Sequence, residues 1–179
     1  MFKTPFALLS LVSIVSCQML TELEWNPQYF SMVPDICANP PILSYHLHPM
    51  MWANVPKQVE KAMTFQREFM EHFDIVGKKN CTFNVHDPNQ KEICTWGVHW
   101  VPDGPFNNAQ FAFFIPKADY QRVVEWSSKH RNGLDILVHP NTGCQIQDHS
   151  LWAEWNGSPW QLDAGEFTCN APWPACGGL

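Results

Sequence analysis

The chain has 179 residues, of which 45% are hydrophobic and 16% are charged, and its formal net charge is −6. This length suffices for one domain with a sizeable core, and the composition is typical of a globular rather than a disordered protein. The acidic balance and the lack of a basic cluster argue against nucleic acid and anionic membrane surfaces as partners.

Residues 1–17 have the pattern of a secretory signal peptide. Lys3 supplies a positive start, and the apolar run from Phe6 to Val15 is too short to span a bilayer. Small residues, including Ser16, precede the expected cleavage point. We therefore expect a secreted, extracellular protein with no membrane segment after removal of the signal.

The cysteines agree with export. Removal of residues 1–17 leaves an even number of cysteines, as a disulfide framework requires. These are Cys37, Cys81, Cys94, Cys144, Cys169 and Cys176. Local spacing favours pairing Cys81 with Cys94 and Cys169 with Cys176, which leaves Cys37 with Cys144, although six cysteines allow many other pairings and these remain open.

Hydrophobic periodicity predicts a short series of elements after an extended, proline-rich arm at residues 18–41. Residues 42–48 alternate as a strand that Pro49 ends or bends, and Pro56 begins an amphipathic helix that continues to Phe73. Further strands are expected at residues 93–100, 109–115 and 134–138, with a second helix at residues 116–130.

The order strand, helix, strand, strand, helix, strand predicts an α+β, ferredoxin-like sandwich. Such a fold places two helices on one face of a mostly antiparallel sheet. We expect this domain to span residues 42–163 and to be followed by a Cys/Pro/Gly-rich tail at residues 164–179. Disulfide bonds are expected to stabilise this fold.

Histidines gather at the predicted strands and their ends. His46 and His48 are two residues apart in one strand, so both side chains project from the same face. His99, His139 and His149 follow at or just beyond later strand ends, where sites are commonly built. Two imidazoles on one face form half of a transition-metal site, although two ordinary histidines on a half-exposed strand remain the alternative.

Several segments together resemble the small, ferredoxin-like DOPA 4,5-dioxygenase family of fungi and bacteria. They are Tyr45-His46-Leu47-His48, Gly97-Val98-His99, the run from Arg131 to Gly143, Asp148-His149-Ser150 and Trp155-Asn156-Gly157. The sequence His-Pro-Asn-Thr-Gly at residues 139–143, combined with Asp148-His149, is the most specific part. The resemblance extends over about residues 42–163, and this chain would be a secreted member.

The resemblance implies a non-haem iron enzyme that opens a catechol ring with dioxygen. The matching histidines, as metal ligands or close neighbours of the metal, are His46, His48, His99 and His139. Ferrous iron is the expected cofactor, with zinc or copper as alternatives because extracellular imidazoles bind both tightly.

The resemblance also implies roles for three further residues. His149 with Asp148 would form an acid/base pair, or a pair that orients a ligand. Arg131 would meet a substrate carboxylate, since arginine forms bidentate pairs with carboxylates. A solvated charge at the helix end is the alternative for Arg131.

The functional hypothesis is a secreted, metal-dependent extradiol dioxygenase that acts on DOPA-like or other catechols. Its partners would be a small aromatic substrate and dioxygen, with a homodimer left open. The chain departs from the family at Pro49, directly after His48, and at Val98, where the family has proline. A non-enzymatic secreted protein that binds a metal or a small aromatic ligand on the same scaffold is therefore the competing hypothesis, and a purely structural domain is the third.

Overall fold

A computed structural model describes residues 37–77, 81, 91–167, 169–172 and 175. The predicted signal peptide, most of the predicted arm and Cys176 lie outside these residues, so the expectations about them remain predictions. Within the described part of the chain, no helix is both long enough and apolar enough to cross a membrane.

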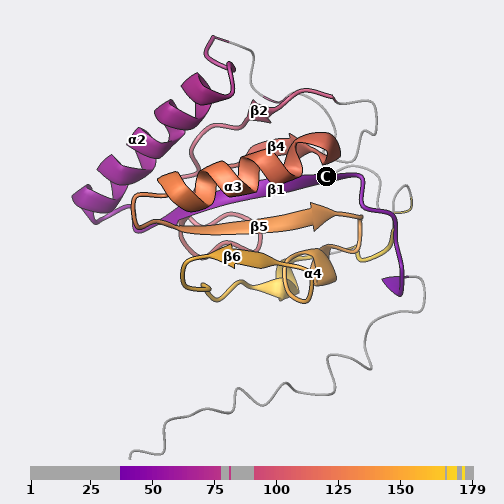
Figure 1. The fold of residues 1–179 in the computed structure, drawn as a ribbon. Coiled ribbons are helices and arrows are strands. Elements are labelled where there is room, and N and C mark those ends of the chain that lie inside the picture. The colour runs from indigo at the N-terminus through magenta and orange to yellow at the C-terminus, as the bar shows by residue number, and fades with distance from the viewer. Residues whose placement is uncertain (1–36, 78–80, 82–90, 168, 173–174, 176–179) are drawn as a thin grey trace, which may run out of the picture. The chain divides into compact units, whose positions relative to one another are not determined.

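Six strands form one antiparallel sheet in the order β2-β4-β1-β5-β6, with β3 pairing with β1 (Figure 1). The strands are β1 (Ser44–Met51), β2 (Cys94–Thr95), β3 (Ala109–Gln110), β4 (Phe113–Pro116), β5 (Asp135–Asn141) and β6 (Glu154–Asn156). The order of β2, β4, β1 and β5 is that of a ferredoxin-like sheet. The predicted α+β class is confirmed.

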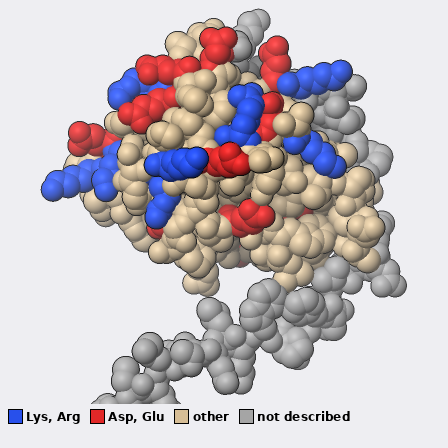
Figure 2. Space-filling view, viewed as in Figure 1, with Lys and Arg blue, Asp and Glu red and all other residues tan. Residues whose placement is uncertain are grey.

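Two long helices separate these strands. They are α2 (Pro56–His72) and α3 (Tyr120–His130), the latter preceded by the 3₁₀ turn η2 (Lys117–Asp119). Two short elements follow β5, namely α4 (Gln145–Asp148) and η3 (Ala164–Glu166). Figure 2 shows basic and acidic side chains intermingled on the side that bears α2 and α3, which is typical of solvated helix surfaces.

The main core lies between the helices and one face of the sheet. Phe65 and Phe69 of α2 are fully buried, and the Phe69 ring stacks on Phe113 of β4 at 3.8 Å between centroids. Leu47 of β1 and Val123 of α3 belong to the same cluster. Full burial of each of these side chains contributes roughly 1.5–3 kcal/mol. The helices therefore occupy this face, and the opposite face of the sheet carries a different set of side chains.

Four strand predictions need correction. The strand expected at residues 42–48 is β1, which begins at Ser44 and continues through Pro49 to Met51. The strand expected at residues 93–100 is only Cys94–Thr95, and the strand expected at residues 109–115 is divided into β3 and β4. The strand expected at residues 134–138 continues to Asn141, so His139 lies inside β5 rather than beyond it. Proline is tolerated at position 140 because pairing with β6 ends at Val138, so the missing N–H costs no ladder hydrogen bond on that side.

Two predicted disulfides are confirmed. Cys37 is bonded to Cys144, and Cys81 is bonded to Cys94. The first joins the residues before β1 to the start of α4, beside the end of β5 that carries His139. The predicted Cys169–Cys176 bond lies partly outside the described residues and remains a prediction.

Candidate metal centre

The sheet face opposite the two long helices carries a row of histidines. Alternation along β1 turns Leu47 toward the helical core and His46 and His48 to the other side. The register between β1 and β5 pairs His46 with His139, and the register between β1 and β4 pairs His46 with Phe114. Three imidazoles from two adjacent central strands are thus set side by side.

These three histidines form a compact, buried cluster. Each offers one ring nitrogen, and these atoms all lie within 4.8 Å of one another. The ring centroids of His46 and His48 are 5.1 Å and 5.2 Å from that of His139. The residues retain only 8%, 5% and 2% exposure, in the order His46, His48, His139. A site on central strands is held more rigidly than one on loops, which favours a precise ligand geometry.

Hydrogen bonds orient two of the imidazoles. His139 donates from Nδ1 to the Pro140 carbonyl oxygen at 2.9 Å, and His48 donates from Nδ1 to Gln110 Oε1 at 3.0 Å. Each Nε2 atom then carries a lone pair, yet the two Nε2 atoms lie 3.2 Å apart. Two lone pairs directed at one point suit a shared metal ion, whereas a direct hydrogen bond between the two nitrogens needs one ring in the other tautomer.

This spacing fits a transition-metal ion. Metal–nitrogen bonds of about 2.1 Å at tetrahedral or octahedral angles place two ligand nitrogens about 3.0–3.4 Å apart. Imidazole is a suitable ligand for iron, zinc and copper, and a partner oxygen on the other ring nitrogen is the usual second contact of a metal-bound histidine. The donor set therefore fits a transition-metal ion, and it fits iron, zinc and copper alike.

Burial keeps His48 and His139 in the uncharged form that binds metals. Burial lowers the pKa of His48 to about 3, against the opposing effect of the Gln110 hydrogen bond. The pKa of His139 is also held well below its ordinary value, first by burial and then by the neighbouring imidazoles. Neutral rings need lose no proton before they coordinate a cation.

A pocket of about 330 Å³ opens above the cluster. The three histidines lie on its floor, and the aromatic side chains of Trp96, Phe106 and Phe167 form its walls. Phe106 stacks on His48 with 4.6 Å between ring centroids. Apolar aromatic walls over a few convergent polar groups are typical of sites for small aromatic molecules.

His149 lies in this pocket, as the sequence predicted. Its ring is 3.8 Å from that of His139 between centroids, and its Nδ1 donates to the Gln145 carbonyl oxygen at 2.9 Å. Burial lowers the pKa of His149 to about 4, opposed by that backbone hydrogen bond. The ring is therefore neutral at physiological pH, with Nε2 as its proton acceptor.

The Asp148 carboxylate is hydrogen-bonded to the turn after β5 rather than to a histidine. Its carboxylate accepts hydrogen bonds from the Thr142 backbone N–H at 3.0 Å and from the Thr142 hydroxyl at 2.8 Å. Burial raises the pKa of Asp148 to about 7 despite these hydrogen bonds, which lower it. The residue lines the pocket, but the contacts described for it are with the turn that follows His139 and not with His149.

His99 lines the same pocket but is not part of the three-histidine cluster. Its Nδ1 lies 2.7 Å from Asp103 Oδ2, and its side chain is 43% exposed. The backbone of His99 bridges to Gln110, which places the residue at the rim of the pocket. The structure thus brings together three of the four predicted ligands.

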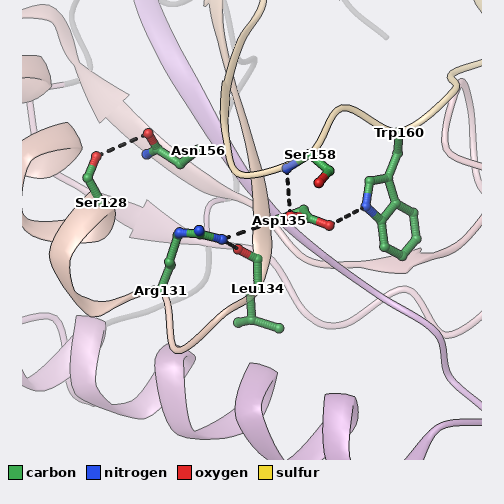
Figure 3. A network of polar contacts seen from close by, with 7 residues as sticks. All are labelled: Ser128, Arg131, Leu134, Asp135, Asn156, Ser158 and Trp160. Atoms are coloured by element: carbon green, nitrogen blue, oxygen red, sulfur yellow. Dashed lines mark hydrogen bonds and ion pairs between the residues drawn. The ribbon is translucent and has the colours of Figure 1, made fainter. Parts of the chain in front are cut away.

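Arg131 lies away from the pocket. Figure 3 shows it at the end of α3, where its Nη1 atom donates to the Leu134 carbonyl oxygen at 2.7 Å. It also lies 3.9 Å from Asp135, whose carboxylate accepts hydrogen bonds from Ser158 N and Trp160 Nε1. Arg131 is not among the residues that line the pocket, so the predicted contact with a substrate carboxylate finds no support.

Two features of the site escaped the sequence reasoning. Gln110, the partner of His48, lies in a dense apolar run and carries no motif that marks it. Phe167 belongs to the predicted Cys/Pro/Gly-rich tail, yet it lines the pocket and packs on His149 with 4.7 Å between centroids. An amide within an apolar strand is the only signal that could have drawn attention to Gln110.

Comparisons with known proteins agree with this geometry. The model of the Dopa 4,5-dioxygenase family matches residues 45–166, a range that contains the three clustered histidines, His149 and Gln110. The match begins at the second residue of β1 and ends with η3.

Two individual proteins are also similar. A DOPA 4,5-dioxygenase of Amanita muscaria is 29% identical over 66 residues, which are 37% of this chain but only 29% of the length of that relative. A solved structure from Nostoc punctiforme, of a protein with a provisional dioxygenase assignment, matches with a TM-score of 0.54 and 24% identity. The match covers 70% of this chain and 90% of the Nostoc chain, which shows a shared fold.

Proposed function

Because the chain belongs to the Dopa 4,5-dioxygenase family and buries a three-histidine cluster, we propose that it is a metal-dependent dioxygenase that opens catechol rings. The observation that carries the proposal is the 3.2 Å approach of His48 Nε2 to His139 Nε2, with both Nδ1 atoms donating to oxygen acceptors. This arrangement suits a cation bound by both nitrogens, and the pocket above it would leave room for the substrate.

We further propose that the metal is ferrous iron, held by His46, His48 and His139. When bound, ferrous iron would supply the chemistry that activates the catechol and dioxygen for reaction with each other. The three imidazoles would fix the ion on a rigid sheet, beneath a pocket that admits the substrate. His99 would act at the rim with Asp103 rather than as a ligand.

The remaining residues of the pocket would bind and deprotonate the catechol. Trp96, Phe106 and Phe167 would pack on the ring and exclude water from the floor. His149 would take the phenolic proton on Nε2, because its Nδ1 is committed to the Gln145 carbonyl. Asp148 would act as a positioning residue, since it holds the Thr142 turn that follows His139.

We also propose an extracellular location. The two described disulfides, Cys37–Cys144 and Cys81–Cys94, are typical of oxidising compartments. This agrees with the signal peptide predicted at residues 1–17. Secretion is tested by expressing the full chain in a eukaryotic host and determining the N-terminal residue of the protein recovered from the medium.

The activity is tested by anaerobic reconstitution of the disulfide-intact protein. Ferrous iron is added, then L-DOPA or another catechol, and absorbance is followed after admission of air. The proposal predicts a yellow ring-opened product that is lost in His48→Ala and His139→Ala but retained in His130→Ala, an exposed histidine on α3. Tight retention of zinc or copper without any product would instead favour the non-enzymatic metal-binding hypothesis.

A further inference from the structure

Acidic side chains outnumber lysine and arginine around the pocket. Its lining includes three carboxylates, those of Asp103, Asp148 and Glu166, and none of the described lining residues is lysine or arginine. Asp148 lies deep in the pocket and is tied to Thr142. Asp103 and Glu166 are exposed, so both carboxylates face the solvent-accessible end of the pocket.

This distribution bears on the part of a substrate that extends from the catechol ring. A catechol whose two oxygens face the histidine floor directs its ring substituent toward the open end. There the substituent meets the carboxylates of Asp103 and Glu166. Asp103 already contacts His99 Nδ1 at 2.7 Å, whereas no side-chain partner is described for Glu166, so Glu166 is the carboxylate available to the substituent. A cationic substituent is attracted there, and an anionic one is repelled.

The arginine expected to accept a substrate carboxylate is engaged elsewhere. Arg131 lies in the network of Figure 3, with Leu134 and Asp135 as its partners. No cation therefore balances a carboxylate within the described lining of the pocket. The net charge of the whole chain, −6, likewise attracts cationic and repels anionic substrates.

We propose that this pocket selects catechols whose side chain carries an ammonium group and no carboxylate. The inference rests on the proposed function and narrows its substrate class. Glu166 of η3 is the specificity-determining residue, and Asp103 assists it. The kcat/KM of amino-acid catechols, which carry both charges, is expected to lie between the values for purely cationic and purely anionic catechols.

The test uses matched catechols that differ in side-chain charge. Dopamine supplies a cation, 4-ethylcatechol is neutral, and dihydrocaffeate supplies an anion. With the iron-loaded full chain, kcat/KM is expected to fall in that order, with about tenfold between the extremes at low ionic strength. Added salt should shrink the difference, because both carboxylates are exposed. Equal values, or a preference for dihydrocaffeate, would overturn the inference.

Two variants separate a local from a general effect of charge. Glu166→Gln should reduce the preference for dopamine, whereas Glu125→Gln, which removes an exposed charge from α3, should leave it unchanged. Equal effects of the two substitutions would show that net charge alone is responsible, and would overturn the role of Glu166.

A binding measurement keeps this inference separate from the proposed function. The same catechols are titrated anaerobically into the zinc-loaded protein, and tryptophan fluorescence reports binding. Tighter binding of dopamine than of dihydrocaffeate would support the charge preference even if no catechol were turned over, in which case only the dioxygenase proposal would fail. Equal binding, or no binding of any catechol, would overturn the inference.

Discussion

His48 and His139 face each other across adjacent strands with 3.2 Å between their Nε2 atoms, while each Nδ1 donates to an oxygen. The strand register produces this approach, because β1 and β5 are antiparallel neighbours and both side chains project from the same face. The strand register therefore brings two ring nitrogens to a spacing at which one metal ion can bind both.

Metal retention should depend on three histidines only. Alanine at His46, His48 or His139 removes one ligand from the cluster, and each variant is expected to lose stoichiometric metal after loading and gel filtration. His99→Ala should retain the metal, because His99 lies outside the cluster. Elemental analysis of the four variants measures this, and loss of metal in His99→Ala would restore the four-histidine site that the sequence suggested.

Gln110 should strengthen metal affinity although its side chain does not bind the metal. Gln110→Leu removes the acceptor of the His48 Nδ1–H at a buried position and frees the ring to rotate. Loss of such a partner typically lowers metal affinity 10–100-fold. A competition titration with a chromophoric chelator gives the affinity, and Gln58→Leu on α2 serves as a control away from the pocket. Unchanged affinity in Gln110→Leu would contradict the assigned tautomer.

The sequence could predict two of the three clustered histidines for a simple reason. The two-residue period of a strand places His46 and His48 on one face whatever the strand pairs with. The position of His139 depends on the register between β1 and β5, which joins residues far apart in the chain and leaves no local signal. The sequence therefore indicated that these histidines could converge, but not which of the other candidates would join them.

Asp148 should make stability depend on pH. Burial raises its pKa from an ordinary value of 3.8 to about 7, so the folded protein binds more protons than the unfolded chain between these values. The stabilisation from the neutral carboxyl is fully present below about pH 4 and is lost as the pH rises through 7. A shift of about three pKa units corresponds to about 4 kcal/mol.

Comparison with Asp148→Asn isolates this effect. Asparagine preserves the shape and cannot ionise, while the buried histidines titrate equally in both proteins. Denaturant unfolding at several pH values should show wild type losing up to about 4 kcal/mol relative to the variant between pH 4 and pH 8. A difference that stays constant with pH would show that the Asp148 carboxyl has an ordinary pKa.

Gly157 should tolerate no side chain. Its φ is +115°, and a Cβ there would clash with the Asp135 carboxylate and approach Arg131 Nη1 at 2.8 Å. Gly157→Ala is therefore expected to destabilise the protein by roughly 1–3 kcal/mol, in line with the cost of strained backbone. Gly97→Ala is the matched control, because no atom lies within 4 Å of its Cβ position. Thermal unfolding measures both, and equal melting temperatures would contradict the packing shown in Figure 3.

The two described disulfides should contribute unequally. Cys37–Cys144 closes a loop with a sequence separation of 107, whereas Cys81–Cys94 closes one of 13. In the chain-entropy account, the longer loop contributes about 5 kcal/mol and the shorter one about 3 kcal/mol. Double alanine variants at each pair, compared by denaturant unfolding, test this ranking. A larger loss from the Cys81–Cys94 pair would show that native contacts rather than chain entropy dominate.

The outer part of the pocket could not be predicted from the sequence, for a different reason. Phe167 follows the last predicted element, in a segment rich in cysteine, proline and glycine. This segment has no hydrophobic periodicity from which a helix or strand could be predicted. Its place on His149 follows from the course of the chain after β6, which is fixed by tertiary contacts such as the bridge between Phe106 and Leu162. The tail therefore completes the pocket although its sequence reads only as a loop.

The most direct test of the central claim is isotope labelling of the product. The iron-loaded protein is mixed anaerobically with dopamine or L-DOPA, exposed to ¹⁸O₂, and the product is analysed by mass spectrometry. Ring cleavage by a dioxygenase predicts that a ring-opened product carries both oxygen atoms of one labelled dioxygen molecule, with no such product from His139→Ala. A quinone without label, formed equally by wild type and variant, would contradict the proposed activity.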